Sequence, residues 1–131
     1  MSRILNPGLY AITDPKLLDE HSLFTKVESA LKGGCRVLQY RDKPASASQK
    51  LERARTLKSL CHQYDAQLII NDDLDLCLQS EADGVHLGKS DGDILEARKM
   101  LGPERILGVT CHSDLDYAQQ CIQLGVDYCA F

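Results

Sequence analysis

Short apolar runs alternate along this chain with longer segments whose apolar residues recur at helical spacing. Each run is rich in aliphatic and β-branched residues and is bounded by polar or glycine positions, a pattern typical of buried parallel strands. Six strands are therefore predicted, over residues 9–13, 36–40, 67–70, 84–87, 106–109 and 126–131.

The segments between the strands indicate amphipathic helices, because their apolar residues lie three and four positions apart. Ser46 and Gln49 form a capping-box pattern at the start of the longest helix, and Gly33, Gly102 and Gly125 mark helix ends. A short helix is expected over residues 74–78. The positions expected to face the core are Leu23, Val27, Ala30 and Leu31, then Leu51, Ala54, Leu57, Cys61 and Tyr64, then Ile94, Ala97, Arg98 and Leu101, then Leu115, Ala118, Cys121 and Ile122.

Strict alternation of strand and helix predicts a parallel sheet with right-handed crossovers, which either closes into a barrel or stays open and doubly wound. No G-x-G-x-x-G motif follows the first strand, which weakens the nucleotide-binding form of the open sheet. Polar residues follow nearly every strand, and a site assembled from many strand ends is typical of barrels. We therefore predict an α/β fold, a TIM (β/α)8 barrel. This chain, a single domain over residues 1–131, covers about its first six strands.

The length of the chain bears on this prediction. An eight-stranded barrel needs roughly 200 residues, whereas this chain has 131. The sequence stops inside the sixth predicted strand, and such an end would leave an unpaired strand edge and an uncovered apolar face. We therefore expect the chain to be a fragment of a longer protein.

Composition argues against several classes of function. The net charge is -4 without basic or acidic blocks, so no nucleic-acid or membrane surface is expected. No stretch approaches the ~20 apolar residues of a membrane span, and the N-terminus lacks the features of a secretory signal. The six cysteines show no C-x-x-C pair, and we expect them to be reduced core residues of a cytoplasmic protein.

The second predicted strand ends in a polar segment, Gln39-Tyr40-Arg41-Asp42-Lys43. Because side chains alternate along a strand, Gln39, Arg41 and Lys43 can point in one direction where the chain leaves the sheet. Arginine offers a two-pronged donor for phosphate oxygens, lysine a mobile charge, and glutamine a donor and an acceptor that suit a heterocycle edge. The alternative is a solvent-facing strand end with a surface Arg–Asp pair.

Two later strands end in acidic residues that are candidates for a metal site. Asp72 and Asp73 follow the third strand, and Asp91 follows the fourth. Mg²⁺ takes one or two carboxylates together with phosphate oxygens and water, so Asp72 and Asp91 at one sheet edge predict a magnesium site. Each also has a simpler interpretation as the N-cap of the following helix, with Asp73 as an alternative cap to Asp72.

The fifth strand ends in Thr110, with His112 close behind it. The Thr110 hydroxyl can donate to a diphosphate oxygen, and His112 is a candidate acid or base. The alternative is a hydroxyl-stabilised turn or cap at the start of the next helix. His86 lies within the fourth strand, where we expect it to satisfy a hydrogen bond of the core.

Taken in order, these motifs resemble those of the thiamine-phosphate synthase family of TIM-barrel enzymes. The ordered set is Q-x-R-x-K, I-I-N-D, D-G-V-H-L-G-x-x-D, G-V-[ST]-x-H-S and G-x-D-Y, and the likeness runs from Gly8 to Tyr128. That family joins hydroxymethylpyrimidine diphosphate to hydroxyethylthiazole phosphate, giving thiamine phosphate and pyrophosphate. The resemblance therefore implies a transferase of thiamine biosynthesis that acts on two small phosphorylated substrates.

The resemblance also implies roles for individual residues. Asp72 and Asp91 would hold Mg²⁺, and the catalytic Arg41, Lys43 and Thr110 would stabilise the charge that grows on the leaving diphosphate. The mechanism proposed for the family is dissociative: the thiazole nitrogen traps a pyrimidine-stabilised carbocation, so no protein nucleophile is required. The implied substrate-binding residues are Gln39, Tyr40, Arg41, Asp42, Lys43, Asn71 and Thr110.

The sequence departs from the family pattern in two ways. Lys89 stands where the family usually has glutamine, and its role is open between assisting the diphosphate and facing solvent. The residues for the thiazole phosphate would lie beyond Phe131, so the fragment alone is expected to be inactive. Two alternatives stay open: a metal-free isomerase like the thiazole tautomerase, and a non-catalytic half-barrel that binds thiamine precursors or a partner chain. The presence of both Asp72 and Asp91 favours the synthase.

Overall fold

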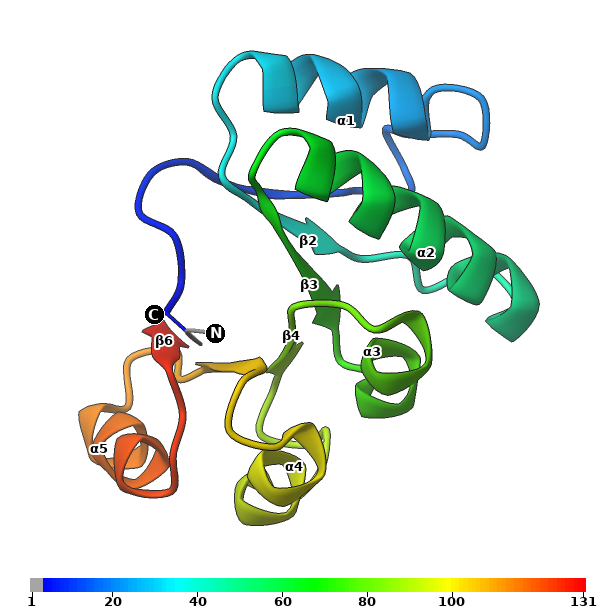
Figure 1. Cartoon of the computed structure of the whole chain (residues 1–131). Coiled ribbons are helices and arrows are strands. Elements are labelled where there is room, and N and C mark those ends of the chain that lie inside the picture. Colours follow the sequence, from blue (N-terminus) through cyan, green and yellow to red (C-terminus); the bar gives the residue numbers. More distant parts are fainter. Residues whose placement is uncertain (1–3) are drawn as a thin grey trace.

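The structure is a computed structural model that describes residues 4–131, along which strands and helices alternate (Figure 1). The strands are β1 (Tyr10–Ile12), β2 (Val37–Tyr40), β3 (Gln67–Asn71), β4 (Gly84–Leu87), β5 (Ile106–Thr110) and β6 (Tyr128–Ala130). The helices are α1 (Leu23–Lys32), α2 (Ala47–Gln63), α3 (Leu74–Ser80), α4 (Ile94–Leu101) and α5 (Leu115–Gln123). All six predicted strands are confirmed, with small differences at their ends.

The strands form one parallel sheet whose order in space, β1-β2-β3-β4-β5-β6, is also their order along the chain. Figure 1 shows this sheet curling, with the helices distributed around its outer side. A doubly wound sheet would reverse its strand order and carry helices on both faces, and neither feature occurs in residues 4–131. The fold is a curled, six-stranded parallel half-barrel.

Local sequence signals determine where the helices begin. The backbone N–H of Gln49 donates to Ser46 Oγ at 3.3 Å, and the Ser46 N–H donates to Gln49 Oε1 at 3.0 Å, which confirms the predicted capping box. Asp73, Asp93 and Asp114 cap α3, α4 and α5 by accepting from a backbone N–H three residues further on. Each such cap contributes about 1 kcal/mol to helix stability.

The prediction for α5 was wrong at two positions. Ala118 and Cys121 are buried as expected, whereas Leu115 and Ile122 are 67% and 60% exposed. A helix that packs mainly on the strands beneath it buries a narrow stripe. Leu115 and Ile122 are seven positions apart and lie on one line beside that stripe, so they face solvent.

The two faces of the sheet bury different layers. The outer face packs against the helices in the larger cluster, and the inner face holds a smaller one. The outer strand residues include Leu38, Leu68, Val85 and Leu107. The inner cluster consists of Val37, Ile69 and Ile106, with Leu5, Tyr10 and Tyr128 packed against them. Because side chains alternate, the inner face carries polar residues further along the same strands, including Gln39 and Asn71.

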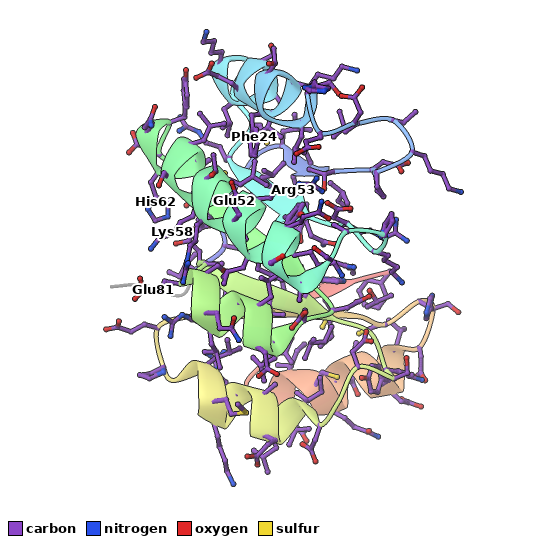
Figure 2. The ribbon with its side chains drawn as sticks, turned by 90° about the vertical axis from the view of Figure 1, so that its right-hand side faces the viewer. Phe24, Glu52, Arg53, Lys58, His62 and Glu81 are labelled. Carbon is purple, nitrogen blue, oxygen red and sulfur yellow. The ribbon has the colours of Figure 1, made fainter. Side chains whose placement is uncertain are left out.

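The N-terminal ends of the strands are held by two aspartates that accept hydrogen bonds from neighbouring strands. Asp83 Oδ2 accepts from the backbone N–H of Leu68 at 2.7 Å and lies 2.9 Å from His62 Nε2. Asp127 repeats this arrangement beside β5, where its Oδ2 pairs with Arg98 at 2.9 Å. Figure 2 shows His62 near the C-terminal end of α2, with Lys58 and Glu81 on the same side of the molecule. This end of the sheet therefore serves stability.

The cysteines are free thiols that lie mostly in the core. All six cysteines are unpaired, and all but Cys129 are buried, as expected for thiols that pack as small apolar groups. Among residues 4–131, no helix combines the length and the apolar character that crossing a bilayer requires.

Candidate functional site

Polar side chains gather around two cavities at the C-terminal ends of the strands. The first, called here the acidic cleft, has a volume of about 560 Å³ and includes Lys43, Lys50, Asp72 and Asp91 in its wall. The second, called here the inner cavity, has a volume of about 420 Å³ and lies against the inner face of the sheet. Its wall includes Tyr10, Gln39, Arg41, His86, Thr110 and Tyr128. Asn71 lines both cavities, which therefore adjoin.

The structure brings Asp72 and Asp91 together in the wall of the acidic cleft, where their carboxyl groups interact electrostatically. Asp91 Oδ2 also accepts from the backbone N–H of Gly88 at 2.7 Å, which fixes the turn after β4. Neither residue is a helix cap, because Asp73 caps α3 and Asp93 caps α4. The simpler interpretation of Asp72 and Asp91 as caps is therefore wrong.

The backbone holds the Asp72 side chain in place. Its φ of 63° lies in the left-handed region, which aspartate tolerates better than most residues at a cost of about 1 kcal/mol. The Asp72 N–H donates to the carbonyl of His86 at 2.8 Å, so the turn after β3 is fastened to β4. This fastening keeps the two carboxylates together across neighbouring strands.

The proximity of the two carboxylates changes their proton affinity. Partial burial and, next, the hydrogen bond and charge of Asp91 raise the pKa of Asp72. Lys43 acts in the opposite direction, with its Nζ 3.6 Å from Asp72 Oδ2. A divalent cation would stabilise such a pair in its ionised form. In residues 4–131 no set of three or more His, Cys, Asp or Glu side chains is arranged to hold a metal. A cation here would take its other ligands from phosphate and water, as Mg²⁺ commonly does.

The residues at the end of β2 divide between the two cavities. Gln39 and Arg41 both line the inner cavity, as their common strand face predicts, whereas Lys43 lies in the acidic cleft. The predicted common direction is wrong for Lys43 because regular alternation ends with the strand at Tyr40. Thr13, which sequence analysis missed, fixes the backbone where the chain leaves β2. Its Oγ1 accepts from Arg41 N at 2.8 Å and donates to Arg41 O at 3.0 Å.

Tyr40 and Asp42 form a clamp with Arg53 of α2. Tyr40 Oη donates to Asp42 Oδ2 at 2.7 Å, and Arg53 donates to the same oxygen at 2.8 Å. The side chains of Arg53 and Asp42 are 17% and 11% exposed. The predicted alternative of a surface Arg–Asp pair is wrong, because Asp42 pairs with a partly buried arginine from the helix layer. Tyr40 and Asp42 also line the acidic cleft, and their role in substrate binding stays a prediction.

Thr110 and His86 meet in the inner cavity. Thr110 Oγ1 lies 2.7 Å from His86 Nε2, and His86 Nδ1 lies 2.9 Å from Tyr128 Oη. The expectation that His86 satisfies a hydrogen bond of the core is confirmed. Burial lowers its pKa, which favours the neutral imidazole near pH 7. The interpretation of Thr110 as a cap is wrong, since Asp114 caps α5.

Sequence analysis missed Tyr10 and Tyr128, whose hydroxyl oxygens lie 2.5 Å apart. Gln39 Nε2 donates to Tyr10 Oη at 2.8 Å, so the two tyrosines connect Gln39 to His86. Strand alternation was the available signal, because it puts both tyrosines on a single face of their strands. Their meeting depends on the curl of the sheet, since 118 positions separate them in the sequence.

The question left open for Lys89 has a structural answer. Its Nζ lies 3.1 Å from Asp114 Oδ2 and 4.4 Å from the centre of the Tyr117 ring. It is absent from the wall of the acidic cleft and instead joins the turn after β4 to the start of α5. His112, the candidate acid or base, is exposed and has a left-handed φ of 52°.

Comparisons with known sequences agree with this geometry. The family model described as thiamine monophosphate synthase matches residues 9–131. The thiamine-phosphate synthase of Alcanivorax borkumensis is 54% identical over 123 residues, covering 94% of this chain and 57% of the relative. That of Marinobacter nauticus is 49% identical over 127 residues, covering 97% and 57%. The chain thus spans somewhat more than half the length of these curated relatives.

Solved structures give the same result. A thiamine phosphate pyrophosphorylase from Pyrococcus furiosus superposes with a TM-score of 0.82 at 37% identity, over 92% of this chain and 57% of that one. An uncharacterized B. cereus protein superposes with a TM-score of 0.61 at 16% identity, over 96% of this chain and 36% of that one. The second likeness concerns the fold alone.

Proposed function

This chain belongs to the thiamine monophosphate synthase family, and we propose that it forms part of a transferase of thiamine biosynthesis. The reaction joins hydroxymethylpyrimidine diphosphate to hydroxyethylthiazole phosphate and releases pyrophosphate. The observation that carries the proposal is the contact between Asp72 and Asp91 with Lys43 beside them, in a cleft that adjoins a second cavity. Paired carboxylates can hold the metal of a metal-bound diphosphate, and the ammonium group of a neighbouring lysine can bind its phosphate oxygens.

The proposal extends to the fold of the whole enzyme, a TIM (β/α)8 barrel. It is supported by the strand order and curl of β1 to β6, which such barrels share. The chain spans 57% of the A. borkumensis relative, and no residue of this chain is assigned to the thiazole phosphate.

Asp72 and Asp91 would hold Mg²⁺, and the donor set fits this ion. Two carboxylates at the mouth of a cleft leave the remaining positions to diphosphate oxygens and water. When bound, Mg²⁺ would neutralise charge on the diphosphate and so make pyrophosphate a better leaving group. The raised pKa of Asp72 supports this assignment, because a cation between the carboxylates would offset both the burial and the neighbouring Asp91 that raise it.

The chain's own residues would position the two ends of the pyrimidine substrate. The diphosphate would lie in the acidic cleft beside Lys43, and the pyrimidine in the inner cavity, where Gln39 offers amide atoms to the ring edge. Asn71 lines both cavities and would contact the diphosphate where they meet. Arg41 and Thr110, which line the inner cavity, would approach the diphosphate at the same junction from that side.

The bond between the methylene carbon and the diphosphate oxygen would break first. Negative charge would grow on that oxygen, and Arg41, Lys43 and the Thr110 hydroxyl would stabilise it. Positive charge on the methylene carbon would be delocalised into the pyrimidine, and the thiazole nitrogen would then form the new carbon–nitrogen bond. No protein side chain is bonded to substrate in this sequence of steps.

The direct test is an assay of the protein encoded by the full gene. We expect thiamine phosphate and pyrophosphate to appear only when both substrates and Mg²⁺ are supplied. Interconversion of thiazole isomers without metal and without pyrophosphate release would instead indicate the tautomerase alternative. The 131-residue chain by itself is expected to be inactive, because it spans 57% of its relatives. Robust pyrophosphate release by that chain would contradict this expectation, and its stable pairing with a partner would instead favour the half-barrel alternative.

A further inference from the structure

Side chains from five strands form a continuous hydrogen-bonded relay across the inner cavity. Gln39 of β2 contacts Tyr10 of β1 at 2.8 Å, and Tyr10 contacts Tyr128 of β6 at 2.5 Å. Tyr128 contacts His86 of β4 at 2.9 Å, and His86 contacts Thr110 of β5 at 2.7 Å. We call these residues the tyrosine–histidine relay. Its two ends, Gln39 and Thr110, are both residues that the proposed function assigns to substrate.

The chemistry of the members fixes one bond of the relay and favours one direction for the rest. The amide nitrogen of Gln39 can only donate, so Tyr10 Oη accepts this bond. Either hydroxyl can donate across the Tyr10–Tyr128 contact; the arrangement that leaves no phenol proton unused has Tyr10 donating to Tyr128 and Tyr128 donating to His86 Nδ1. A neutral imidazole that accepts at Nδ1 carries its proton on Nε2, which faces Thr110. In this direction every proton of the relay is used once.

The last bond determines what Thr110 offers to a ligand. If His86 Nε2 donates, Thr110 Oγ1 accepts this bond, and the hydroxyl proton stays available on the cavity side. If the relay ran the other way, Thr110 would give its proton to His86 and present only lone pairs to the cavity. Lone pairs would repel an anionic diphosphate, whereas a free O–H would bind it.

We propose that Tyr128 and His86 are positioning residues that keep the Thr110 proton directed at the leaving diphosphate. The proposal rests on the proposed function in one respect only, the identity of the ligand that Thr110 contacts. The direction of the relay is a property of the protein alone and is measurable without substrate.

The packing around Tyr128 is built to hold its ring in this position. Gly108 of β5 lies directly beneath the ring, and a Cβ at that position would overlap it. The ring centres of Tyr128 and His86 are 5.5 Å apart, and the ring of Tyr10 packs edge-on against Tyr128 at 5.8 Å. Burial raises the pKa of Tyr128, so its phenol keeps the proton that the relay requires.

Histidine tautomers, read by ¹⁵N NMR of the full-length protein, test the direction. We expect His86 to carry its proton on Nε2 in the wild type. Tyr128→Phe keeps the ring but removes the phenol, and should give a mixture of tautomers. Tyr64→Phe is the matched control, because its hydroxyl bonds Glu28 outside the relay. A wild-type His86 protonated on Nδ1, or an unchanged tautomer in Tyr128→Phe, would overturn the proposal.

Kinetics test whether Tyr128 acts through Thr110. We expect Tyr128→Phe to lower kcat about tenfold, as for one lost hydrogen bond in the transition state, with little change in KM. Thr110→Ser should retain turnover, and Thr110→Val should lose it. The double variant Tyr128→Phe, Thr110→Val should have the same residual kcat as Thr110→Val alone. A further loss of kcat in the double variant would overturn the proposal. A wild type that makes no thiamine phosphate would refute the proposed function, while the tautomer still decides the relay.

Discussion

Asp72 and Asp91 differ from the acidic residues around them in what their oxygens contact. Asp73, Asp93 and Asp114 give their side-chain oxygens to helix N-termini, where they act as caps. Asp72 instead faces Asp91 and Lys43 in the acidic cleft. This difference distinguishes the two carboxylates that we propose as Mg²⁺ ligands from the helix caps a few residues away.

The first prediction concerns Asp91. Asp91→Asn keeps an oxygen that accepts from Gly88 N and removes the charge, so the turn should survive while magnesium binding weakens. We expect turnover at limiting magnesium to fall roughly 100-fold, as when one charge-stabilising group is lost. Asp93→Ala is the control, and should cost about 1 kcal/mol of stability and leave turnover unchanged. Unaltered turnover in Asp91→Asn would reduce Asp91 to its role in the turn.

Two lysines close to the acidic residues should behave differently. Lys43 lies beside Asp72, whereas Lys89 pairs with Asp114 and Tyr117 outside the acidic cleft. We expect Lys43→Gln to lower turnover about tenfold or more, because the positive charge beside the diphosphate is lost. Lys89→Gln should leave turnover unchanged. Steady-state assays of both variants with both substrates check this. Equal losses in the two variants would mean that Lys89 also reaches the diphosphate.

At the scale of elements, the clamp of Tyr40, Asp42 and Arg53 joins the loop after β2 to α2. Breaking a largely buried pair from one side leaves an uncompensated charge. Arg53→Met should therefore lower the free energy of unfolding by about 3 kcal/mol. Arg55→Met, two positions along α2, removes only a weak bond of 3.5 Å to Gln79 O and serves as the control. Urea denaturation of both variants measures the difference, and similar losses would refute the clamp.

The elements themselves were largely predictable from the sequence, for a local reason. Strand positions follow from short apolar runs, and helix starts follow from caps such as Ser46, whose signals lie within a few residues. The choice among neighbouring aspartates was not predictable. Asp72 or Asp73 could cap α3 by sequence, and the left-handed φ of Asp72 decides between them. Too many residues of α5 were predicted to be buried. The spacing of apolar residues shows which side of a helix faces the core, but not how wide a strip of that side the sheet covers.

At the scale of the whole molecule, the sequence predicted a barrel but not which side chains the curvature of the sheet would bring together. The motif residues Gln39, Asn71 and Thr110 were identified because each ends an apolar run. Tyr10 and Tyr128 were missed because an aromatic residue within a predicted strand is ordinarily interpreted as part of the hydrophobic core. Only the curled sheet brings their hydroxyls together and so connects Gln39 with Thr110.

The buried thiols make the stability of the molecule depend on alkaline pH. Burial raises the pKa of Cys61 and of Cys77 from the ordinary 9.0 to about 12. Above pH 9 the unfolded chain releases protons that the folded chain retains, so the unfolded state is favoured as pH rises. The stabilisation is complete below pH 9 and is lost progressively between pH 9 and about 12.

We therefore expect the free energy of unfolding to fall between pH 8 and pH 10 by about 1 kcal/mol for each such thiol. Urea titrations at the two pH values measure this fall. Cys77→Ala should lower stability at pH 8 by leaving a small cavity, yet should show a smaller fall toward pH 10. Ser80→Ala is the control, because it changes a buried side chain that does not titrate in this range, and it should leave the fall unchanged. A fall in Cys77→Ala equal to that of the wild type would show that other groups, such as the buried tyrosines, cause the alkaline loss.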